Sequence, residues 1–181
     1  MHLCGYSLGG RLALGLLIRH PDLFAAATII GANPGLSSEA ERRARVLEDE
    51  KWAQLIETHG VEAFAERWAA QPLFASQRGL PPDVLGAQEE ERRRHDPARL
   101  ASAMRALGLG AMPSYVDALT RIRANVRYVA GELDTKFVAL GRTMASRTPD
   151  ATFDVVPGAG HNVVLESPEV LAACLRAATR G

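Results

Sequence analysis

The segment Gly5–Arg11, which reads Gly-Tyr-Ser-Leu-Gly-Gly-Arg, restricts the fold of this chain more than any other. It carries the pattern G-x-S-x-G between a short apolar stretch, residues 1–4, and a helical pattern, residues 12–20. A serine on a tight turn from a strand into a helix projects its hydroxyl away from the backbone, and the glycines two before and two after it avoid Cβ clashes. Ser7 is therefore a candidate nucleophile or base. The alternative, a serine that only caps the helix, stays open at this point.

The bulk composition is that of one ordinary soluble domain. The chain has 181 residues, 47% of them hydrophobic and 23% charged, and its Lys+Arg and Asp+Glu residues number 21 each. Because no net charge favours nucleic acid or an anionic membrane, neither is expected as a partner. Cys4 and Cys174 suit a reducing compartment and form no C-x-x-C site. No nucleotide or flavin motif is visible either, so we expect no metal and no other cofactor.

An apolar run near the start of the chain bears on location. Residues 1–30 contain it, but charged residues such as Arg11, Arg19 and Asp22 interrupt it and no basic segment precedes it. This pattern supports neither a signal peptide nor a membrane span. A cytoplasmic protein is expected.

Strand and helix patterns alternate in residues 1–36 and 113–181. A continuous apolar run at residues 25–31, closed by the turn Asn33-Pro34-Gly35, is typical of a buried parallel strand. Later strands are expected at residues 126–130 and 152–156, and helices at residues 137–147 and 168–178. This alternation predicts an α/β fold with a parallel sheet of about four strands.

Residues 37–112 have a different character. They are charged and alanine-rich, with no convincing strand, and predict helices at residues 39–59, 61–70, 82–94 and 97–107. A helical insertion between two strands of one sheet is how such folds build a cap over an active site. We therefore expect two parts, a core of residues 1–36 with 113–181 and a helical cap of residues 37–112.

The loops after the two later strands carry an acid and a histidine. One reads Gly131-Glu132-Leu133-Asp134 and the other Pro157-Gly158-Ala159-Gly160-His161-Asn162. Loops that follow parallel strands lie at one edge of the sheet, so Ser7, Asp134 and His161 are expected to converge there. Their order along the chain is the one that the Ser, Asp and His triad of the α/β-hydrolase fold uses.

Simpler interpretations of these residues remain open at this level. Asp134 has the position of a helix cap, and Glu132 is a rival carboxylate in the same loop. His161, in a glycine-rich loop, has the surroundings of an incidental turn residue. Its position after the last predicted strand favours a base.

Several segments together resemble one enzyme family, the 2-succinyl-6-hydroxy-2,4-cyclohexadiene-1-carboxylate synthases. These are lyases of menaquinone biosynthesis with an α/β-hydrolase fold. The resemblance covers essentially the whole chain in the right order. The segments are Gly5–Arg11, Asn33–Leu36, Trp68 with Gln71–Phe74, Gly131–Phe137 and Gly158–Asn162.

The resemblance implies a reaction and roles for the triad. The reaction is elimination of pyruvate from 2-succinyl-5-enolpyruvyl-6-hydroxy-3-cyclohexene-1-carboxylate, begun by abstraction of a ring proton. Ser7, activated by His161, whose tautomer the carboxylate of Asp134 would hold, would be the base and not an acyl acceptor. The amide of Leu8 would donate to the charge that develops on the succinyl carbonyl.

The resemblance also implies a pocket for a substrate with several carboxylates. By similarity, Arg11, Arg45 and Arg92 would bind those carboxylates through paired hydrogen bonds, and Tyr6 and Trp68 would shape the pocket. Taken alone, the arginine runs around Arg45 and Arg92 are typical of solvated helix faces, and the choice of Arg92 over its neighbours is open.

The resemblance further implies strands before the nucleophile turn, which this sequence does not contain. We expect an earlier part of roughly 80 residues, from the ~200 to 250 that one such domain can occupy, with a His-Gly loop that supplies a second oxyanion donor. Without it, the strand before Ser7 would be an exposed sheet edge, and the chain is expected to be marginally stable, to self-associate, or to be a fragment whose true start lies upstream. Two alternatives to the lyase remain: a serine esterase or C–C hydrolase of the same fold, and an inactive truncated remnant.

Overall fold

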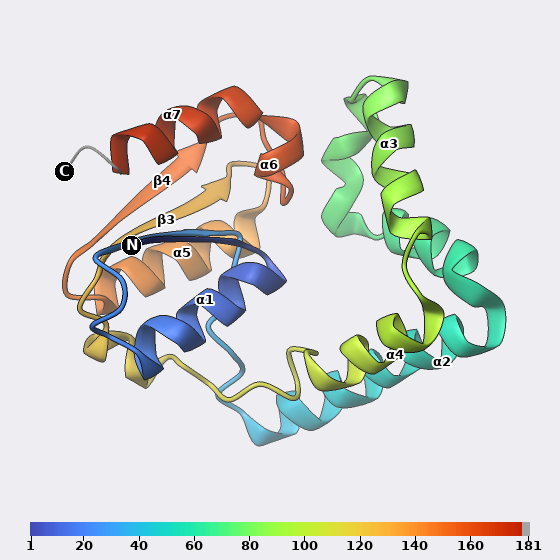
Figure 1. Cartoon of the computed structure of the whole chain (residues 1–181), viewed down its shortest axis with the longest axis horizontal. Coiled ribbons are helices and arrows are strands. Elements are labelled where there is room, and N and C mark those ends of the chain that lie inside the picture. Colours follow the sequence, from blue (N-terminus) through green and yellow to red (C-terminus); the bar gives the residue numbers. More distant parts are fainter. Residues whose placement is uncertain (179–181) are drawn as a thin grey trace. The chain divides into compact units, whose positions relative to one another are not determined.

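The computed structural model describes residues 1–178 and divides the chain into two compact units (Figure 1). Unit 1 consists of Met1–Pro34 and Ser114–Gly181, and unit 2 is Gly35–Pro113. These boundaries lie within two residues of those expected from the sequence. Unit 1 is the α/β part, and unit 2 is helical.

Unit 1 is built on a parallel sheet, as the sequence predicts. Its described strands lie in the order β1-β2-β3-β4, and every neighbouring pair is parallel. The strands are β1 (His2–Tyr6), β2 (Ala26–Ile30), β3 (Asn125–Gly131) and β4 (Ala151–Val156). The central strand β2 is almost wholly buried, which explains its unbroken apolar sequence.

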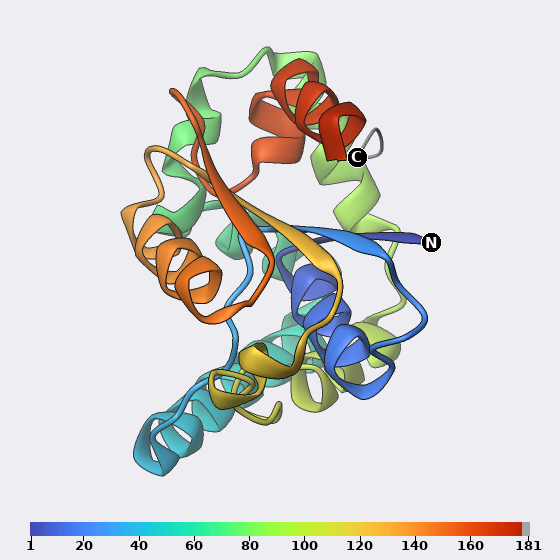
Figure 2. The same ribbon diagram turned by 90° about the vertical axis from the view of Figure 1, so that its left-hand side faces the viewer.

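Helices cover both faces of this sheet (Figures 1 and 2). Leu14 and Leu17 of α1 (Leu8–Arg19) and Met144 of α5 (Thr135–Arg147) pack with β2 and β3 in one buried cluster. Val163 of α6 (Val163–Glu166) and Leu171 of α7 (Pro168–Ala178) pack with β2, β3 and β4 in another. A short 3-10 helix, η2 (Asp117–Arg121), precedes β3. The described part of unit 1 thus has a hydrophobic cluster on each face of the sheet.

A buried tyrosine anchors the first of these cores. Tyr128 on β3 is fully buried, and its hydroxyl lies 2.8 Å from the hydroxyl of Thr148, which follows α5. Burial raises the pKa of Tyr128 to about 12. The hydrogen bond satisfies the one polar group of this side chain within an apolar cluster.

Element boundaries differ from the predicted ones by one or two residues at most of the ends. Strand β1 continues to Tyr6, beyond the predicted end at Cys4, because Tyr6 pairs with Ile30 of β2. Helix α5 begins at Thr135 and not at Phe137, because Asp134 caps its first turn. The first difference depends on a contact with a distant strand, and the second on a cap three residues away in the chain.

Unit 2 contains only helices in the described structure. They are α2 (Glu39–Ala69), the 3-10 helix η1 (Pro72–Gly79), α3 (Pro82–Arg93) and α4 (Pro97–Ala106). The two helices expected at residues 39–59 and 61–70 are joined at Gly60, whose φ of 82° interrupts the helix. Helices α2 and α4 share a small buried cluster that includes Ile56, Phe64 and Ala101. None of the helices described combines the length and the apolarity needed to span a bilayer.

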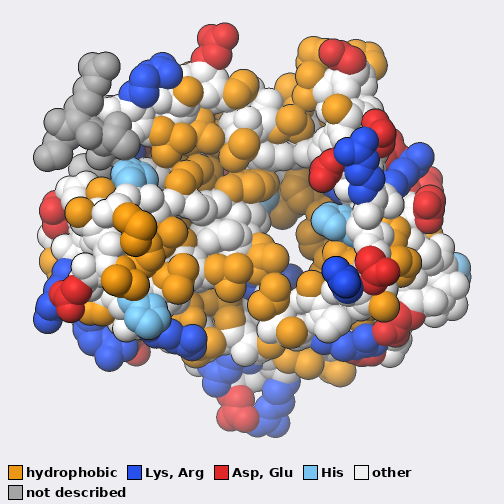
Figure 3. Space-filling model, in the orientation of Figure 1, with side chains coloured by type: hydrophobic (Ala, Val, Ile, Leu, Met, Phe, Trp, Pro, Cys, Tyr) orange, Lys and Arg blue, Asp and Glu red, His pale blue; other side chains and the backbone are white. Residues whose placement is uncertain are grey.

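Strand β1 is an edge of the sheet in the part of the chain that the structure describes. Beside it, α1 exposes a stripe of leucines one turn apart: Leu8, Leu12, which is 49% exposed, and Leu16. Figure 3 shows hydrophobic side chains at the surface over α1. Unpaired backbone groups next to an apolar stripe favour pairing with another chain.

We propose that the chain self-associates with a second copy of itself through β1 and this stripe, because an edge strand can pair with its own copy around a two-fold axis. The mass from light scattering should then rise with protein concentration. Leu12→Glu combined with Leu16→Lys should abolish that rise, whereas Val170→Lys, an exposed position on α7, should leave it unchanged. A double variant that associates like the unmodified chain would rule out this surface.

Candidate active site

Ser7 lies on the turn from β1 into α1, with a strained backbone. Its φ of 50° and ψ of −110° make it the one non-glycine residue of the described chain with positive φ. The amide of Ser7 donates to the carbonyl of Ile30 at 2.8 Å, and its carbonyl accepts from the amide of Arg11 at 3.0 Å. The strand and the helix together hold the serine in this conformation.

The glycines around Ser7 have unequal roles. A Cβ at Gly5 would overlap the backbone of Gly9, and one at Gly10 would lie 2.8 Å from the Cβ of Ala32. A Cβ at Gly9 would meet nothing within 4 Å. The expectation that Gly9 must lack a side chain is therefore wrong for this structure, because Gly9 faces outward and Gly10 makes the close approach.

Ser7, His161 and Asp134 form a chain of hydrogen bonds. Ser7 Oγ lies 3.1 Å from His161 Nε2, and His161 Nδ1 lies 2.7 Å from Asp134 Oδ2. The imidazole is 3% exposed and Asp134 8%. Because a carboxylate only accepts, Nδ1 carries the proton towards Asp134, and Nε2 is left to accept from the serine hydroxyl.

The three side chains meet because of the sheet topology. Ser7 follows β1, Asp134 follows β3 and His161 follows β4, and all these strands run in the same direction. Their carboxyl ends therefore share one edge. The convergence expected from the sequence is present in the structure.

The two carboxylates of the first loop have separate partners. Asp134 Oδ1 accepts from the amide of Phe137 at 3.4 Å and so caps α5, while Oδ2 contacts the histidine. Capping and contact with His161 are thus both present. Glu132 is exposed, and its Oε2 accepts from the amide of Gly158 at 2.9 Å. The structure selects Asp134 over Glu132 as the partner of the imidazole.

A further carboxylate, Glu166 at the end of α6, holds the histidine loop. Its two oxygens accept from the amides of Gly160, at 2.7 Å, and Asn162, at 3.1 Å. These amides flank His161 on both sides. Glu166 is not among the predicted site residues, although an acidic residue shortly after a glycine-rich loop is a signal that could have identified it.

The end of β3 touches the histidine loop through main chain. A Cβ at Gly131 would overlap the carbonyl oxygens of Ala159 and Gly160. On another side, Gly31 has a φ of 52°, and a Cβ there would lie 3.3 Å from His161 Cε1. Absent side chains at these two positions let the backbone approach the histidine and its loop closely.

Two aromatic rings lie against the imidazole. The ring centroid of Phe137 lies 4.5 Å from that of His161, and the ring centroid of Tyr6 lies 5.5 Å from it. Tyr6 was expected near the site from the family resemblance. Phe137 was not among the predicted site residues, and its presence in a family-like segment was the only signal for it.

Leu8 and Arg11 start the helix that follows the serine. Leu8 is the first residue of α1, so its amide has no carbonyl one turn earlier within the helix and lies at the positive end of the helix dipole. Arg11 lies one turn further along α1 and is partly buried. The roles expected of them, an oxyanion donor and a carboxylate-binding side chain, stay predictions.

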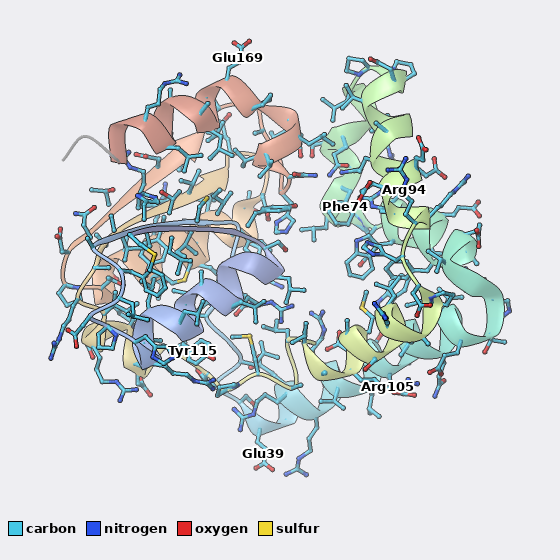
Figure 4. All side chains as sticks on the ribbon, viewed as in Figure 1. Glu39, Phe74, Arg94, Arg105, Tyr115 and Glu169 are labelled. Carbon is cyan, nitrogen blue, oxygen red and sulfur yellow. The ribbon has the colours of Figure 1, made fainter. Side chains whose placement is uncertain are left out.

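The other three expected substrate residues lie in unit 2. Trp68 belongs to an aromatic cluster with ring centroids 5.2 Å from those of Phe64 and Trp52 and 6.2 Å from that of Phe74, which Figure 4 labels. Arg45 Nε donates to Asp49 Oδ1 at 2.8 Å. Arg45 therefore contacts a buried carboxylate and not only solvent.

The arginine run of α3 divides between two environments. Arg93 and Arg94 form exposed ion pairs with glutamates of the same helix. Arg92 instead lies over the ring of Phe74, with Cζ 5.6 Å from the centroid, and lines a pocket of about 230 Å³ between η1 and α3. The structure thus distinguishes Arg92 from its neighbours.

A sequence profile described as "Alpha/beta hydrolase family" matches residues 2–174. This match covers nearly the whole chain. The parallel sheet and the turn that carries Ser7 agree with it. The chain belongs to the alpha/beta hydrolase family, and the fold class expected from the sequence is confirmed.

Individual relatives have more specific names than this family. A 2-succinyl-6-hydroxy-2,4-cyclohexadiene-1-carboxylate synthase of Enterobacter sp. (strain 638) is 34% identical over 173 residues, 96% of this chain and 64% of that protein. A Bacillus subtilis (strain 168) protein, provisionally given the same name, is 35% identical over 168 residues, 93% of this chain and 61% of that protein. The solved structure of MenH from S. aureus has 30% identity and a TM-score of 0.97, covering 99% of this chain and 67% of that one.

These relatives carry the name of the family that the sequence segments resemble, which confirms that recognition. The chain spans less than two thirds of the length of the two curated relatives. The activity of those longer proteins is therefore only proposed for this chain.

The close approach at Gly131 predicts a sharp difference between two glycine variants. Gly131→Ala must displace the main chain of the histidine loop and should lower the free energy of unfolding by about 1–3 kcal/mol. Gly9→Ala should leave it unchanged or raise it by up to about 1 kcal/mol, because alanine is favoured over glycine in a helix. Urea unfolding measures both, and equal midpoints would contradict the packing described.

The Glu166 contacts predict a change in local protection. Glu166→Ala should speed amide hydrogen exchange at Gly160 and Asn162 by roughly 10- to 100-fold, as expected from the loss of charged hydrogen bonds worth about 1.5–3 kcal/mol. In Glu166→Gln, these two amides should exchange at rates between those of the unmodified chain and those of Glu166→Ala. Glu169→Ala, at an exposed position labelled in Figure 4, is the control and should change neither amide. Unaltered exchange in Glu166→Ala would mean that the carboxylate does not hold the loop.

Proposed function

We propose that this protein is a lyase that eliminates pyruvate from 2-succinyl-5-enolpyruvyl-6-hydroxy-3-cyclohexene-1-carboxylate and yields 2-succinyl-6-hydroxy-2,4-cyclohexadiene-1-carboxylate. The observation that carries the proposal is the hydrogen-bonded chain of Ser7, His161 and Asp134, in a protein whose curated relatives bear the name of this synthase. The structure supports the chemistry of the site, and the relatives support the choice of substrate.

In the proposed reaction the serine is a base. His161 Nε2 takes the hydroxyl proton of Ser7, and the serine oxygen takes a proton from the ring of the substrate. The electron pair of that C–H bond forms a ring double bond, the existing ring double bond shifts by one position, and the bond from the ring to the enolpyruvyl oxygen breaks. The departing enolpyruvate gains a proton and becomes pyruvate. Asp134 stays ionised and holds the Nδ1 proton of the imidazole.

Abstraction of the ring proton places negative charge on the succinyl carbonyl oxygen. The amide of Leu8, at the N-terminus of α1, is the proposed donor to that oxygen. A donor fixed by the helix start needs no rearrangement when the charge appears. This arrangement favours the transition state over the ground state.

The substrate in this proposal is a small polycarboxylate. By the family resemblance, Arg11, Arg45 and Arg92 are the proposed carboxylate-binding residues, because a guanidinium offers paired donors to a carboxylate. Tyr6, beside the imidazole, and Trp68, within the aromatic cluster of unit 2, are proposed to shape the pocket.

Release of pyruvate by the purified chain tests the proposal. Ser7→Ala, His161→Ala and Asp134→Asn should each lower kcat on the order of 10³- to 10⁴-fold, as groups that act as a unit do. Glu132→Gln is a matched control in the same loop, since Glu132 contacts Gly158 and not the imidazole, and should cost less than about ten-fold.

Two results would contradict the lyase. One is a folded chain that releases no pyruvate. The other is ester hydrolysis that depends on Ser7 and exceeds pyruvate release, measured with p-nitrophenyl acetate, because it would make the serine an acyl acceptor.

A further inference from the structure

Helix α2 contains one buried carboxylate among many exposed charges. Asp49 is 3% exposed, whereas nearby acidic residues such as Glu48 and Glu57 are exposed. Asp49 Oδ1 accepts from Arg45 Nε at 2.8 Å, and Oδ2 has no hydrogen-bond partner among the residues described. A buried, incompletely satisfied carboxylate costs more stability than an i,i+4 ion pair returns. Helix stability alone therefore does not account for Asp49.

The surroundings of Asp49 keep its carboxylate in one place. Gly108, just after α4, packs so closely that a Cβ there would overlap Asp49 Oδ2 and would lie 2.7 Å from the carbonyl oxygen of Met104. The contact between α2 and α4 thus closes over the carboxylate. Its orientation is fixed by packing within unit 2.

The position of Asp49 determines which edge of the Arg45 guanidinium remains for a ligand. The hydrogen bond to Asp49 uses Nε, and the described structure gives this side chain, which is 37% exposed, no other hydrogen bond or ion pair. Its neighbours differ: Arg42 uses Nη1 on the carbonyls of Leu36 and Ser37, and Arg43 uses Nη2 on Glu39. Only Arg45 in this run keeps its two terminal nitrogens together for a carboxylate.

We infer that Asp49 is a positioning residue that holds the guanidinium of Arg45 by Nε so that its terminal edge binds a substrate carboxylate with two parallel hydrogen bonds. The inference rests on the proposed function, which assigns Arg45 to carboxylate binding. A guanidinium held at one edge loses less rotamer freedom when it binds an anion at the other. Asp49 therefore acts on the affinity for the substrate and not on the proton transfer.

The Arg45 side chain reports this contact without any turnover. In the unmodified chain, the ¹H–¹⁵N signal of Arg45 Nε, assigned by its loss in Arg45→Ala, should exchange slowly with solvent. Asp49→Asn should speed that exchange at least ten-fold. Glu57→Gln is the matched control in the same unit, because it breaks one of the contacts of Arg105, which Figure 4 labels, and leaves Arg45 alone. Unchanged exchange in Asp49→Asn would overturn the inference even if the protein releases pyruvate.

Kinetics of pyruvate release then separate positioning from a purely structural role. Asp49→Asn should raise KM roughly ten-fold with kcat changed less than about three-fold, and Arg45→Lys should behave alike because lysine lacks the paired edge. Arg45→Ala combined with Asp49→Asn should have the KM of Arg45→Ala alone, since coupled residues are not additive. Lower stability with an unaltered KM in Asp49→Asn, or additive effects in the double variant, would overturn the inference. Slow Nε exchange in a chain that releases no pyruvate would contradict the proposed function and not the Arg45 contact.

Discussion

The hydrogen bond between His161 and Asp134 depends on one constraint, that β3 and β4 run side by side in the same direction. The loops that leave two such strands emerge at one edge, and Gly131 lets the main chain of one loop touch the other. Asp134 then serves two structures at once, because one oxygen caps α5 and the other orients the imidazole. The start of a helix and the geometry of the site are thus set by the same carboxylate.

Much of unit 1 could be predicted from the sequence because its signals are local. A serine between two glycines, an unbroken apolar strand and loops that carry an acid and a histidine each occupy a few consecutive residues. What could not be predicted depends on approaches between distant segments. The need for glycine at Gly10 comes from Ala32, and the need for glycine at Gly131 comes from the backbone of Ala159 and Gly160. Neither leaves a periodic pattern.

The charged residues of unit 2 also show what sequence patterns alone cannot predict. A run of arginines on a helix indicates only a solvated face, and the sequence cannot rank its members. The structure separates them by partner: Arg92 lies over an aromatic ring, and Arg45 is held by a buried carboxylate. Such distinctions come from which helix packs nearby, as Gly108 after α4 does beside Asp49.

The strained backbone of Ser7 affects which substitutions at this position would stabilise the protein. A residue with a Cβ at a φ of 50° is strained by on the order of 1–3 kcal/mol, a strain that glycine at the same place would largely avoid. The turn would therefore be less strained with glycine, which lacks both the Cβ and the hydroxyl. Selection for heat tolerance alone would favour that exchange, which would remove the hydroxyl of the proposed base, so stability and the proposed function make opposite demands on this residue.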